Sequence, residues 1–354
     1  MPKRRDRPAD GAARRALLDW YHRKARRLPW RGARSSYAVW VSEVMLQQTQ
    51  VAAVIPHYRR FLRAFPTART LAEAPLEKVL ELWAGLGYYR RARNLHAAAR
   101  ILVRKFNGRF PRDYHEARSL TGVGDYTARA VLSIAYNQPY TVLDGNVARV
   151  VARLRAVRGN LHEPRFRRVV ERDLESLLAP AEPGNFNQAL MELGQTVCLP
   201  RAPRCPICPL RKGCRAFHRR RPESFPAPRP RRATEVRYLA AGLLRRGNQV
   251  ALMRGLDEGL LDDLWNFPAA FGGSPAEALG RLQDKLRGMF DAVVRCGTHV
   301  GGLRHGITFR EIHVNVYAAK PPRRFRTSAV RWFPLSRLSV AAVSQLSRKI
   351  AAQL

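Results

Sequence analysis

Acidic residues are scarce in this sequence. Only 27 Asp and Glu residues stand against 64 Lys and Arg residues in a chain of 354, which leaves a formal net charge of +37. Clustered Lys and Arg attract polyanions through electrostatic steering and counterion release, so nucleic acid is the favoured partner. The alternative is a solvated basic surface that reflects an Arg-rich composition. The charge alone leaves both interpretations open.

Long apolar runs are absent as well. No stretch approaches the ~20 apolar residues that a membrane-spanning helix needs. The N-terminal segment Met-Pro-Lys-Arg-Arg-Asp-Arg is basic, but no apolar core follows it, so it lacks the pattern of a secretory signal. We therefore expect a cytoplasmic protein with no membrane partner.

Cysteine is rare, and four of the five cysteines lie close together in the sequence. Cys198, Cys205, Cys208 and Cys214 are separated by six, two and five residues. This clustering is typical of a metal site in a reducing compartment rather than of a disulfide framework. Four thiolates at such spacing can surround one tetrahedral zinc ion or the corners of an iron–sulfur cube, and the spacing does not choose between them.

The chain divides at a segment rich in proline and arginine, residues 219–232. Before it, helical periodicity is interrupted only by Pro and Gly, which predicts an all-α half. The segment itself predicts an extended linker. After it, apolar pieces of strand length predict a separate α+β domain. Helices are expected over 11–26, 37–48, 51–65, 76–83, 88–106, 126–136, 147–157, 166–178, 185–197, 276–287 and 340–350, and strands over 238–244, 249–253, 293–296 and 311–318.

Two helix starts organise the helical half. Gly122 and Gly124 flank Val123 directly before an expected helix, and both glycines allow a positive φ and a close ligand. The free N–H groups and the positive end of that helix would bind an anion, with phosphate as the expected one. An ordinary glycine-rich turn is the alternative.

Two carboxylates also stand out. Glu43 is the lone acid in a helical run that is otherwise apolar, although a single Glu on a helix is by default a surface residue. Asp144 opens the turn Leu143-Asp-Gly-Asn-Val147, where Asp is equally suited to cap the helix that follows. The residue types alone do not separate capping from chemistry.

Several segments together resemble MutY-type adenine DNA glycosylases, which belong with endonuclease III to the helix-hairpin-helix superfamily. They are Trp40-Val-Ser-Glu-Val-Met-Leu-Gln-Gln-Thr49, Leu82-Trp-Ala-Gly-Leu-Gly-Tyr-Tyr89, the loop Gly122-Val-Gly124, Leu143-Asp-Gly-Asn-Val147 and the four-cysteine spacing. The resemblance is dense over residues 11–215 and loose beyond them.

The resemblance implies a mainly α fold, a helix-hairpin-helix six-helix barrel with an iron–sulfur cluster subdomain, followed by an α+β Nudix-like C-terminal domain. It implies one [4Fe–4S] cluster in place of zinc. The implied boundaries are 1–34 for an N-terminal basic helix that contributes to the cluster subdomain, 35–143 for the barrel, 144–217 for the cluster subdomain, 218–234 for the linker and 235–354 for the Nudix-like domain.

By this resemblance Glu43 is the general acid and base and Asp144 the second carboxylate, with Tyr126 and Asn146 in the same catalytic set. Cleaving an N-glycosidic bond needs an acid to protonate a ring nitrogen and a carboxylate to stabilise the positive sugar. Apolar neighbours would raise the pKa of Glu43. Tyr126 stands where endonuclease III-like relatives carry a Schiff-base lysine, so imine chemistry and strand cleavage are not expected.

Adenine in a duplex must be flipped out before it can react. The resemblance assigns the adenine pocket to Trp30, Arg31, Leu46, Val51 and Gln188. It assigns DNA contacts to Gln48, Thr49, Leu86, Tyr88, Gly122, Val123 and Gly124. Gln48 and Tyr88 would wedge into the base stack. Core packing is the alternative for Trp30 and Tyr88.

Gly259-Leu-Leu-Asp-Asp-Leu-Trp-Asn-Phe-Pro268 resembles the Nudix-like recognition domain of the family. It lacks the Arg-Glu-x-x-Glu-Glu cluster that holds Mg²⁺ in Nudix hydrolases, so binding rather than hydrolysis is expected. In the family a His-x-Phe-Ser/Thr-His loop reads 8-oxoguanine. Here His305-Gly-Ile-Thr-Phe309 keeps the first His and Thr308, the expected lesion contact, but places Ile307 and Phe309 at the other two positions.

These features predict a monomeric, monofunctional base excision repair glycosylase, associated with the bacterial nucleoid, that removes adenine opposite 8-oxoguanine or guanine in double-stranded DNA. One alternative is an endonuclease III-like glycosylase and lyase on damaged pyrimidines, which Tyr126 and the added C-terminal domain oppose. The other is a non-catalytic DNA-binding protein, which would have no need of Glu43.

Overall fold

The computed structural model describes residues 8–32, 35–227, 233–261, 264–307, 309–322, 327–338 and 341–353. Its backbone contacts divide the chain into two compact units. The first comprises Met1–Ala74 and Asn94–Pro230, and the second comprises Pro75–Arg93 and Arg231–Leu354.

The described part of the first unit is helical and contains no strand. Its helices are α1 (Pro8–Lys24), α2 (Ser36–Leu46), α3 (Val51–Ala64), α4 (Ala68–Glu73), α7 (Tyr114–Ser119), α8 (Asp125–Tyr136), α9 (Gly145–Arg155), α10 (Pro164–Leu177), α11 (Pro183–Thr196) and α12 (Arg215–His218). Helix α6 (Arg90–Phe106) begins in the second unit and ends in the first, and α5 (Leu76–Trp83) belongs to the second. The expected all-α half is confirmed.

Helix α2 is buried on nearly every side. Trp40, Val41 and Met45 are each at most 1% exposed. Burying one such side chain contributes roughly 1.5 to 3 kcal/mol, so packing rather than helix propensity holds α2 in place. A helix without a solvent face carries any acid it contains into the interior.

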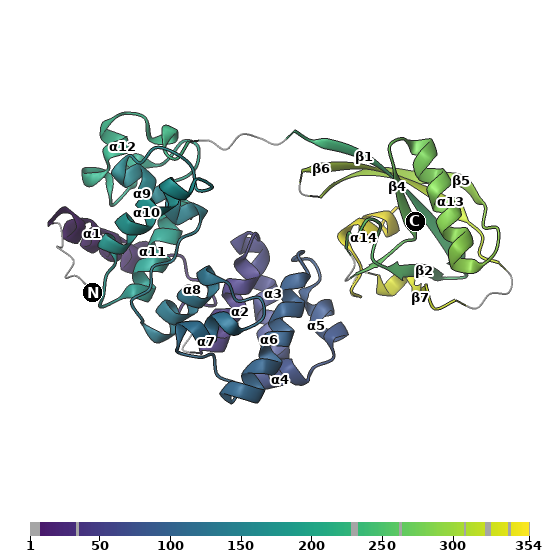
Figure 1. Cartoon of the computed structure of the whole chain (residues 1–354), viewed down its shortest axis with the longest axis horizontal. Helices are drawn as coiled ribbons and strands as arrows, with labels where there is room; N and C mark the ends of the chain where they lie inside the picture. Colours follow the sequence, from purple (N-terminus) through teal and green to yellow (C-terminus); the bar gives the residue numbers. More distant parts are fainter. Residues whose placement is uncertain are drawn as a thin grey trace. The chain divides into compact units, whose positions relative to one another are not determined.

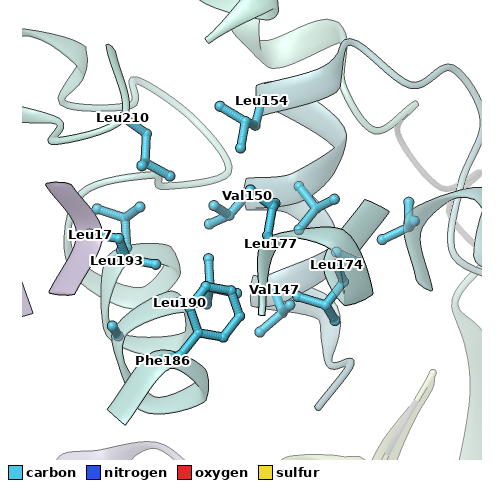
Figure 2. Close-up of a cluster of buried hydrophobic side chains, with 14 of the residues drawn as sticks. Leu17, Val147, Val150, Leu154, Leu174, Leu177, Phe186, Leu190, Leu193 and Leu210 are labelled. Atoms are coloured by element: carbon cyan, nitrogen blue, oxygen red, sulfur yellow. The ribbon is translucent and has the colours of Figure 1, made fainter. Parts of the chain in front are cut away.

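Helix packing links the segments that carry the candidate site. Helix α2 packs on α8, α8 packs on α11, and α11 also packs on α9 and α1 (Figure 1). Figure 2 shows the core that α1 shares with α9, α10 and α11, to which Leu17, Val150, Leu174 and Leu190 belong. A segment at the start of the chain thus completes the core formed by residues 147–210.

The second unit contains a mixed seven-stranded sheet. Its strands are β1 (Glu235–Arg246), β2 (Gln249–Arg254), β3 (Trp265–Asn266), β4 (Ala269–Gly272), β5 (Cys296–Ile307), β6 (Arg310–Ala319) and β7 (Arg331–Pro334). The main order is β3-β2-β1-β6-β5, with β4 paired to β1 and β7 to β2. Strands β1 and β6 run parallel, with Glu235 opposite Arg310, and the other pairs are antiparallel.

Each face of this sheet is covered by a helix. Alternate residues of β1 divide between two cores: Leu239 packs with α14 (Gln345–Ala351), and Ala240 packs with α13 (Pro275–Phe290). Figure 1 shows α13 lying across the strands. The α+β part of the expected fold class is confirmed.

Three expectations about local structure were wrong. A helix was expected over 340–350, but residues 341–344 are not helical and α14 begins only at Gln345. A strand was expected over 293–296, but β5 begins only at Cys296 and runs to Ile307. The sequence pattern missed most of this strand because the glycines within it interrupt the apolar alternation. The segment 219–232 was expected to be extended throughout. Instead a short 3₁₀ turn covers Pro222–Ser224, and Phe225 is buried, with its carbonyl accepting a 2.9 Å hydrogen bond from Arg153 Nε.

Candidate active site

Glu43 lies on α2 and is only 5% exposed. The default surface interpretation of this residue is therefore wrong, because α2 has no solvent face. The pKa of Glu43 is raised from 4.5 to about 7: burial raises it most, a hydrogen bond from Tyr126 lowers it, and the neighbouring Asp144 charge raises it by a smaller amount. Near neutral pH such a carboxyl can both give and take a proton.

Tyr126 lies in the first turn of α8 and faces Glu43. Its hydroxyl donates to Glu43 Oε2 at 3.2 Å and also lies 3.3 Å from Met191 Sδ on α11. Burial, together with the Glu43 and Asp144 charges, raises the pKa of Tyr126 well above its usual value. Tyr126 therefore stays neutral and serves as a hydrogen-bond donor.

Asp144 is the N-cap of α9. Its Oδ1 accepts a 2.7 Å hydrogen bond from Val147 N, and its Oδ2 accepts one of 3.0 Å from Asn146 Nδ2. The capping role expected as one alternative is confirmed. It uses one oxygen, and the same residue lines the cavity that contains Glu43.

Asn146 is held from two directions. Its amide nitrogen donates to Asp144, and its Oδ1 accepts a 2.9 Å hydrogen bond from Arg149 Nη2. Gly194 on α11 allows this close packing, because a Cβ at that position would lie 2.6 Å from Asn146 Cβ. The turn that carries Asp144 is thus fixed by neighbours that sequence spacing could not identify.

A cavity of about 650 Å³ joins these groups. Its volume is typical of a small-molecule site. The expected site residues that line it are Trp30, Arg31, Glu43, Leu46, Gln48, Thr49, Val51, Tyr126, Asp144, Asn146 and Gln188. The structure therefore brings the expected catalytic and pocket residues to one place, together with two of the expected DNA contacts.

Other lining residues were missed from the sequence. They are Arg26, Leu28, Gln50, Ala52, Met191 and Gln195. Met191 and Gln195 follow Gln188 at helical spacing on α11, a signal that could have identified them. Trp30 is 7% exposed and packs edge-to-face on Tyr58 at 5.4 Å between ring centroids, so the packing role considered for it holds alongside its place in the wall.

Asn187 and Glu192 are buried polar residues of α11, the helix that also carries Gln188 and Met191 of the cavity wall. Asn187 is fully buried, and its amide bonds Val142 N, Ser133 Oγ and Tyr140 O at 2.8 to 3.2 Å. Glu192 is 1% exposed and pairs with two arginines. Both partners of Glu192 lie more than 150 residues away in sequence, so no local pattern reveals them.

The glycine loop differs from its expectation at one position. Gly122 has φ of +76°, and a Cβ there would lie 2.5 Å from Asn94 Cβ, so only glycine fits. Gly124, which was also expected to use positive φ, has φ of −83° and is the N-cap of α8. Val123 is buried, with its N–H bonded to Leu120 O. None of the three lines the cavity.

Leu86 and Tyr88 belong to the second unit. Leu86 is buried, whereas Tyr88 is 52% exposed with φ of +47°. The Arg91 guanidinium lies 5.4 Å from the Tyr88 ring centroid. Tyr88 is therefore an exposed aromatic rather than a core residue, and core packing is excluded for it.

The four clustered cysteines line one small cavity of about 20 Å³ beside Arg153. Arg153 is 3% exposed, and its Nη1 lies 3.4 Å from Cys198 Sγ. Burial raises the pKa of Cys208 to about 12, so its thiolate needs a bound cation. No three metal-binding side chains among the described residues converge on a single ion. The four thiols share one cavity with the buried Arg153 beside it, so their donor chemistry fits one metal ion or cluster held in common.

Thr308, the expected lesion contact, lies outside the described residues. On either side of it, His305 is partly buried with Nδ1 unbonded, and Phe309 is 38% exposed under the Arg310 guanidinium. Burial and the nearby Lys349 charge lower the pKa of His305. His305 is therefore neutral near pH 7.

Residues 41–180 match the model of the HhH-GPD superfamily of base excision DNA repair proteins. Over 402 aligned residues the chain is 35% identical to the adenine DNA glycosylase of Mus musculus, covering 96% of this chain and 77% of that protein. This chain belongs to the adenine DNA glycosylase family. The adenine DNA glycosylase of Buchnera aphidicola subsp. Baizongia pistaciae is 43% identical over 57% of each chain.

A solved trapped endonuclease III–DNA covalent intermediate, an estranged-adenine complex, shares the helical fold. Its TM-score is 0.50 at 26% identity, and the match covers 60% of this chain and 97% of that one. The expected helix-hairpin-helix glycosylase fold is thereby confirmed for this adenine DNA glycosylase of base excision repair. No helix in the described parts of the chain is long and apolar enough to cross a membrane.

Proposed function

We propose that this glycosylase hydrolyses the N-glycosidic bond of adenine paired with 8-oxoguanine or guanine in double-stranded DNA and leaves the strand intact. The observation that carries the proposal is Glu43. It is a buried carboxyl with a pKa of about 7, in a cavity that also contains Tyr126 and Asp144.

Glu43 supplies the proton. In its acid form it can protonate a ring nitrogen of a flipped adenine, so that the base leaves neutral rather than as an anion. The carboxylate that remains can take a proton from the attacking water. This cycle needs the carboxyl to exchange a proton near neutral pH, which the raised pKa supports.

Asp144 supplies negative charge for the positive sugar of the transition state. Capping α9 occupies its Oδ1, and the bond from Asn146 orients its Oδ2. Asn146 and Arg149 therefore act by holding the carboxylate in one orientation.

Tyr126 supports hydrolysis over lyase chemistry. An imine with the sugar requires an amine at this place in the site, and a phenol cannot provide one. The Tyr126 hydroxyl instead bonds Glu43 at 3.2 Å. The reaction thus ends with a base-free sugar in an intact strand.

Trp30, Arg31, Leu46, Val51 and Gln188 would surround the flipped base as walls of the cavity. Gln48, Thr49, Leu86, Tyr88, Gly122, Val123 and Gly124 would contact the duplex. The exposed ring of Tyr88 suits insertion into a base stack. The positive charge of the chain supports binding to the phosphate backbone.

Cys198, Cys205, Cys208 and Cys214 would hold one [4Fe–4S] cluster. The cavity that all four thiols line supports one shared metal group, and the resemblance to MutY-type glycosylases favours the cluster over zinc. When bound, the cluster supplies iron–thiolate bonds that tie this loop to the core of α9. The buried Arg153 offsets part of its negative charge.

The decisive experiment is a single-turnover assay on duplexes with adenine opposite 8-oxoguanine, guanine or thymine. We expect adenine release from the first two and not from the third. Equal release opposite thymine would contradict the proposed mispair specificity. No release from any duplex would contradict the assignment of adenine as the substrate base. Release of an oxidised pyrimidine with strand cleavage, in a parallel duplex, would favour the endonuclease III-like alternative.

A further inference from the structure

Glu192 is the most deeply buried acid near the cavity, although it does not line it. Its side chain on α11 is 1% exposed, one helical turn beyond Gln188. An isolated carboxylate at this depth is strongly disfavoured. Burial by itself raises the pKa of Glu192, but the hydrogen bonds and charges of Arg26 and Arg31 outweigh this effect and hold the pKa below its usual value.

The contacts of Glu192 form a fork. Arg26 donates from Nε to Oε1 and from Nη2 to Oε2, each at 2.7 Å, and its backbone N reaches Oε1 at 3.2 Å. Arg31 donates from Nη2 to Oε2 at 2.6 Å. One carboxylate thus holds two arginines of the loop that follows α1.

Arg31 is held on three sides. Besides its bond to Glu192, its Nη1 donates to Arg26 O at 2.8 Å, and its guanidinium lies 5.2 Å from the Tyr21 ring centroid. The side chain is 15% exposed and lines the cavity. A guanidinium fixed in this way is a preorganised donor for an acceptor nitrogen of a bound base.

Glu192 also balances charge in the wall. Arg26 and Arg31 both line the cavity, and Glu192 is their shared anionic partner. Without the carboxylate, two guanidiniums would share one wall, and Arg31 would lose its fixed orientation. Its flexible side chain could then turn toward solvent or toward the DNA backbone.

We propose that Glu192 is a positioning residue of the base pocket, which clamps Arg31 in the orientation in which it meets the flipped adenine. This inference rests on the proposed function and extends it to a residue that does not touch the substrate. Glu192 acts through Arg31, and its bonds to Arg26 anchor the clamp.

The test compares Glu192→Gln with Glu182→Gln. Both residues belong to α11 or its cap, but Glu182 is the N-cap residue with a 43% exposed side chain paired to His22. We expect Glu192→Gln to slow adenine release under saturating single-turnover conditions by roughly 10- to 100-fold, as small misplacements of binding groups do. Glu182→Gln should leave the rate within about twofold.

Two further measurements separate positioning from a structural role. A duplex that carries an abasic-site analogue places no base in the pocket. The Kd of Glu192→Gln for this duplex should therefore stay within about twofold of the wild-type Kd. In an Arg31→Met background, adding Glu192→Gln should slow release by less than about threefold, because the arginine through which Glu192 acts is already absent. A comparable loss of abasic binding, or full additivity with Arg31→Met, would overturn the proposal.

Glu192→Asp keeps the test decisive if Glu192→Gln does not fold. Aspartate keeps the charge balance but is one methylene shorter, so it cannot hold both arginines at the observed distances. We expect a folded enzyme with a reduced release rate and unchanged abasic binding. A wild-type rate in this variant would refute the clamp. An inactive wild-type chain would instead refute the proposed function.

Discussion

The Tyr126 hydroxyl donates a hydrogen bond to Oε2 of Glu43 across 3.2 Å. The two residues come from α8 and α2. Two opposing influences act on the pKa of the Glu43 carboxyl. Burial favours the acid form of Glu43, and the tyrosine bond favours the carboxylate. A group with a pKa of about 7 results, suited to transferring a proton in both directions.

Glu43→Gln should abolish adenine release while leaving duplex binding largely intact. The amide keeps the size of the side chain but can neither donate a carboxyl proton nor accept one. Removal of a general acid typically costs about 10²- to 10⁴-fold in rate. Single-turnover assays on an A:8-oxoguanine duplex measure adenine release, and a gel-shift titration measures duplex binding. Glu116→Gln, at an exposed position, is the matched control. Normal turnover by the Glu43 variant would show that the acid lies elsewhere.

Tyr126→Phe should move the alkaline limb of the pH–rate profile to higher pH. The hydrogen bond from Tyr126 lowers the pKa of Glu43, so its removal raises that pKa and keeps the acid form at higher pH. In the wild-type enzyme the rate should decline above about pH 7 as the proton is lost. Tyr136→Phe on the same helix is the control, because that hydroxyl bonds Phe110 O instead. An unmoved limb would mean that the Tyr126 bond does not tune the acid.

Glu43 should also make stability depend on pH. Its pKa rises from the usual 4.5 to about 7 on folding, so the folded state binds more protons between these values. The stabilising contribution is complete below about pH 4.5 and is lost as pH rises through 7, roughly 3 kcal/mol in all. Glu43→Gln lacks this loss. Denaturant unfolding should therefore show the variant gaining on the wild type from pH 5 to pH 8, and a constant difference would contradict the raised pKa.

Sequence periodicity located most helices because apolar spacing reflects burial directly. Helix α8 was expected over 126–136 and spans Asp125–Tyr136, and α5 matches its expected range of 76–83. The buried position of Glu43 also had a signal, since a helix that is apolar all round must bury any acid it contains.

Other features carry no local signal. Glu192 meets Arg26 and Arg31 only after α11 has packed against the loop behind α1. Gly124 and Gly122 look alike in sequence, yet only Gly122 uses positive φ, and only Gly122 lies against the Asn94 side chain. Strand β5 is obscured by its glycines. Such features depend on tertiary contacts that spacing does not encode.

A [4Fe–4S] cluster at the four cysteines would colour the protein, and removing one thiol should reduce that colour. If the four thiols hold a [4Fe–4S] cluster, the purified protein should be brown, with broad absorbance near ~400 nm, whereas zinc would leave it colourless. Cys208→Ser should remove most of that absorbance, because its thiol is one of the four that line the shared cavity. Cys296→Ser, outside the group, is the control. A colourless wild-type protein that contains zinc would overturn the assignment.

Asp144→Asn separates capping from chemistry at one residue. Asparagine caps a helix about as well as aspartate, so the bond to Val147 N can persist and unfolding free energy should change by less than about 1 kcal/mol. The negative charge expected to stabilise the sugar is lost, so adenine release should fall by roughly 10²-fold or more. Thermal unfolding and single-turnover kinetics on the same preparation measure the two effects.

Asp113→Asn provides the matched control for this substitution. Asp113 caps α7, its Oδ1 accepting bonds from His115 N at 2.7 Å and Glu116 N at 3.0 Å, and it is exposed and does not line the cavity. The same chemical change there should affect stability slightly and adenine release not at all. If Asp144→Asn released adenine at the rate of Asp113→Asn, the carboxylate of Asp144 would be a cap alone, and the sugar cation would need another partner in the cavity.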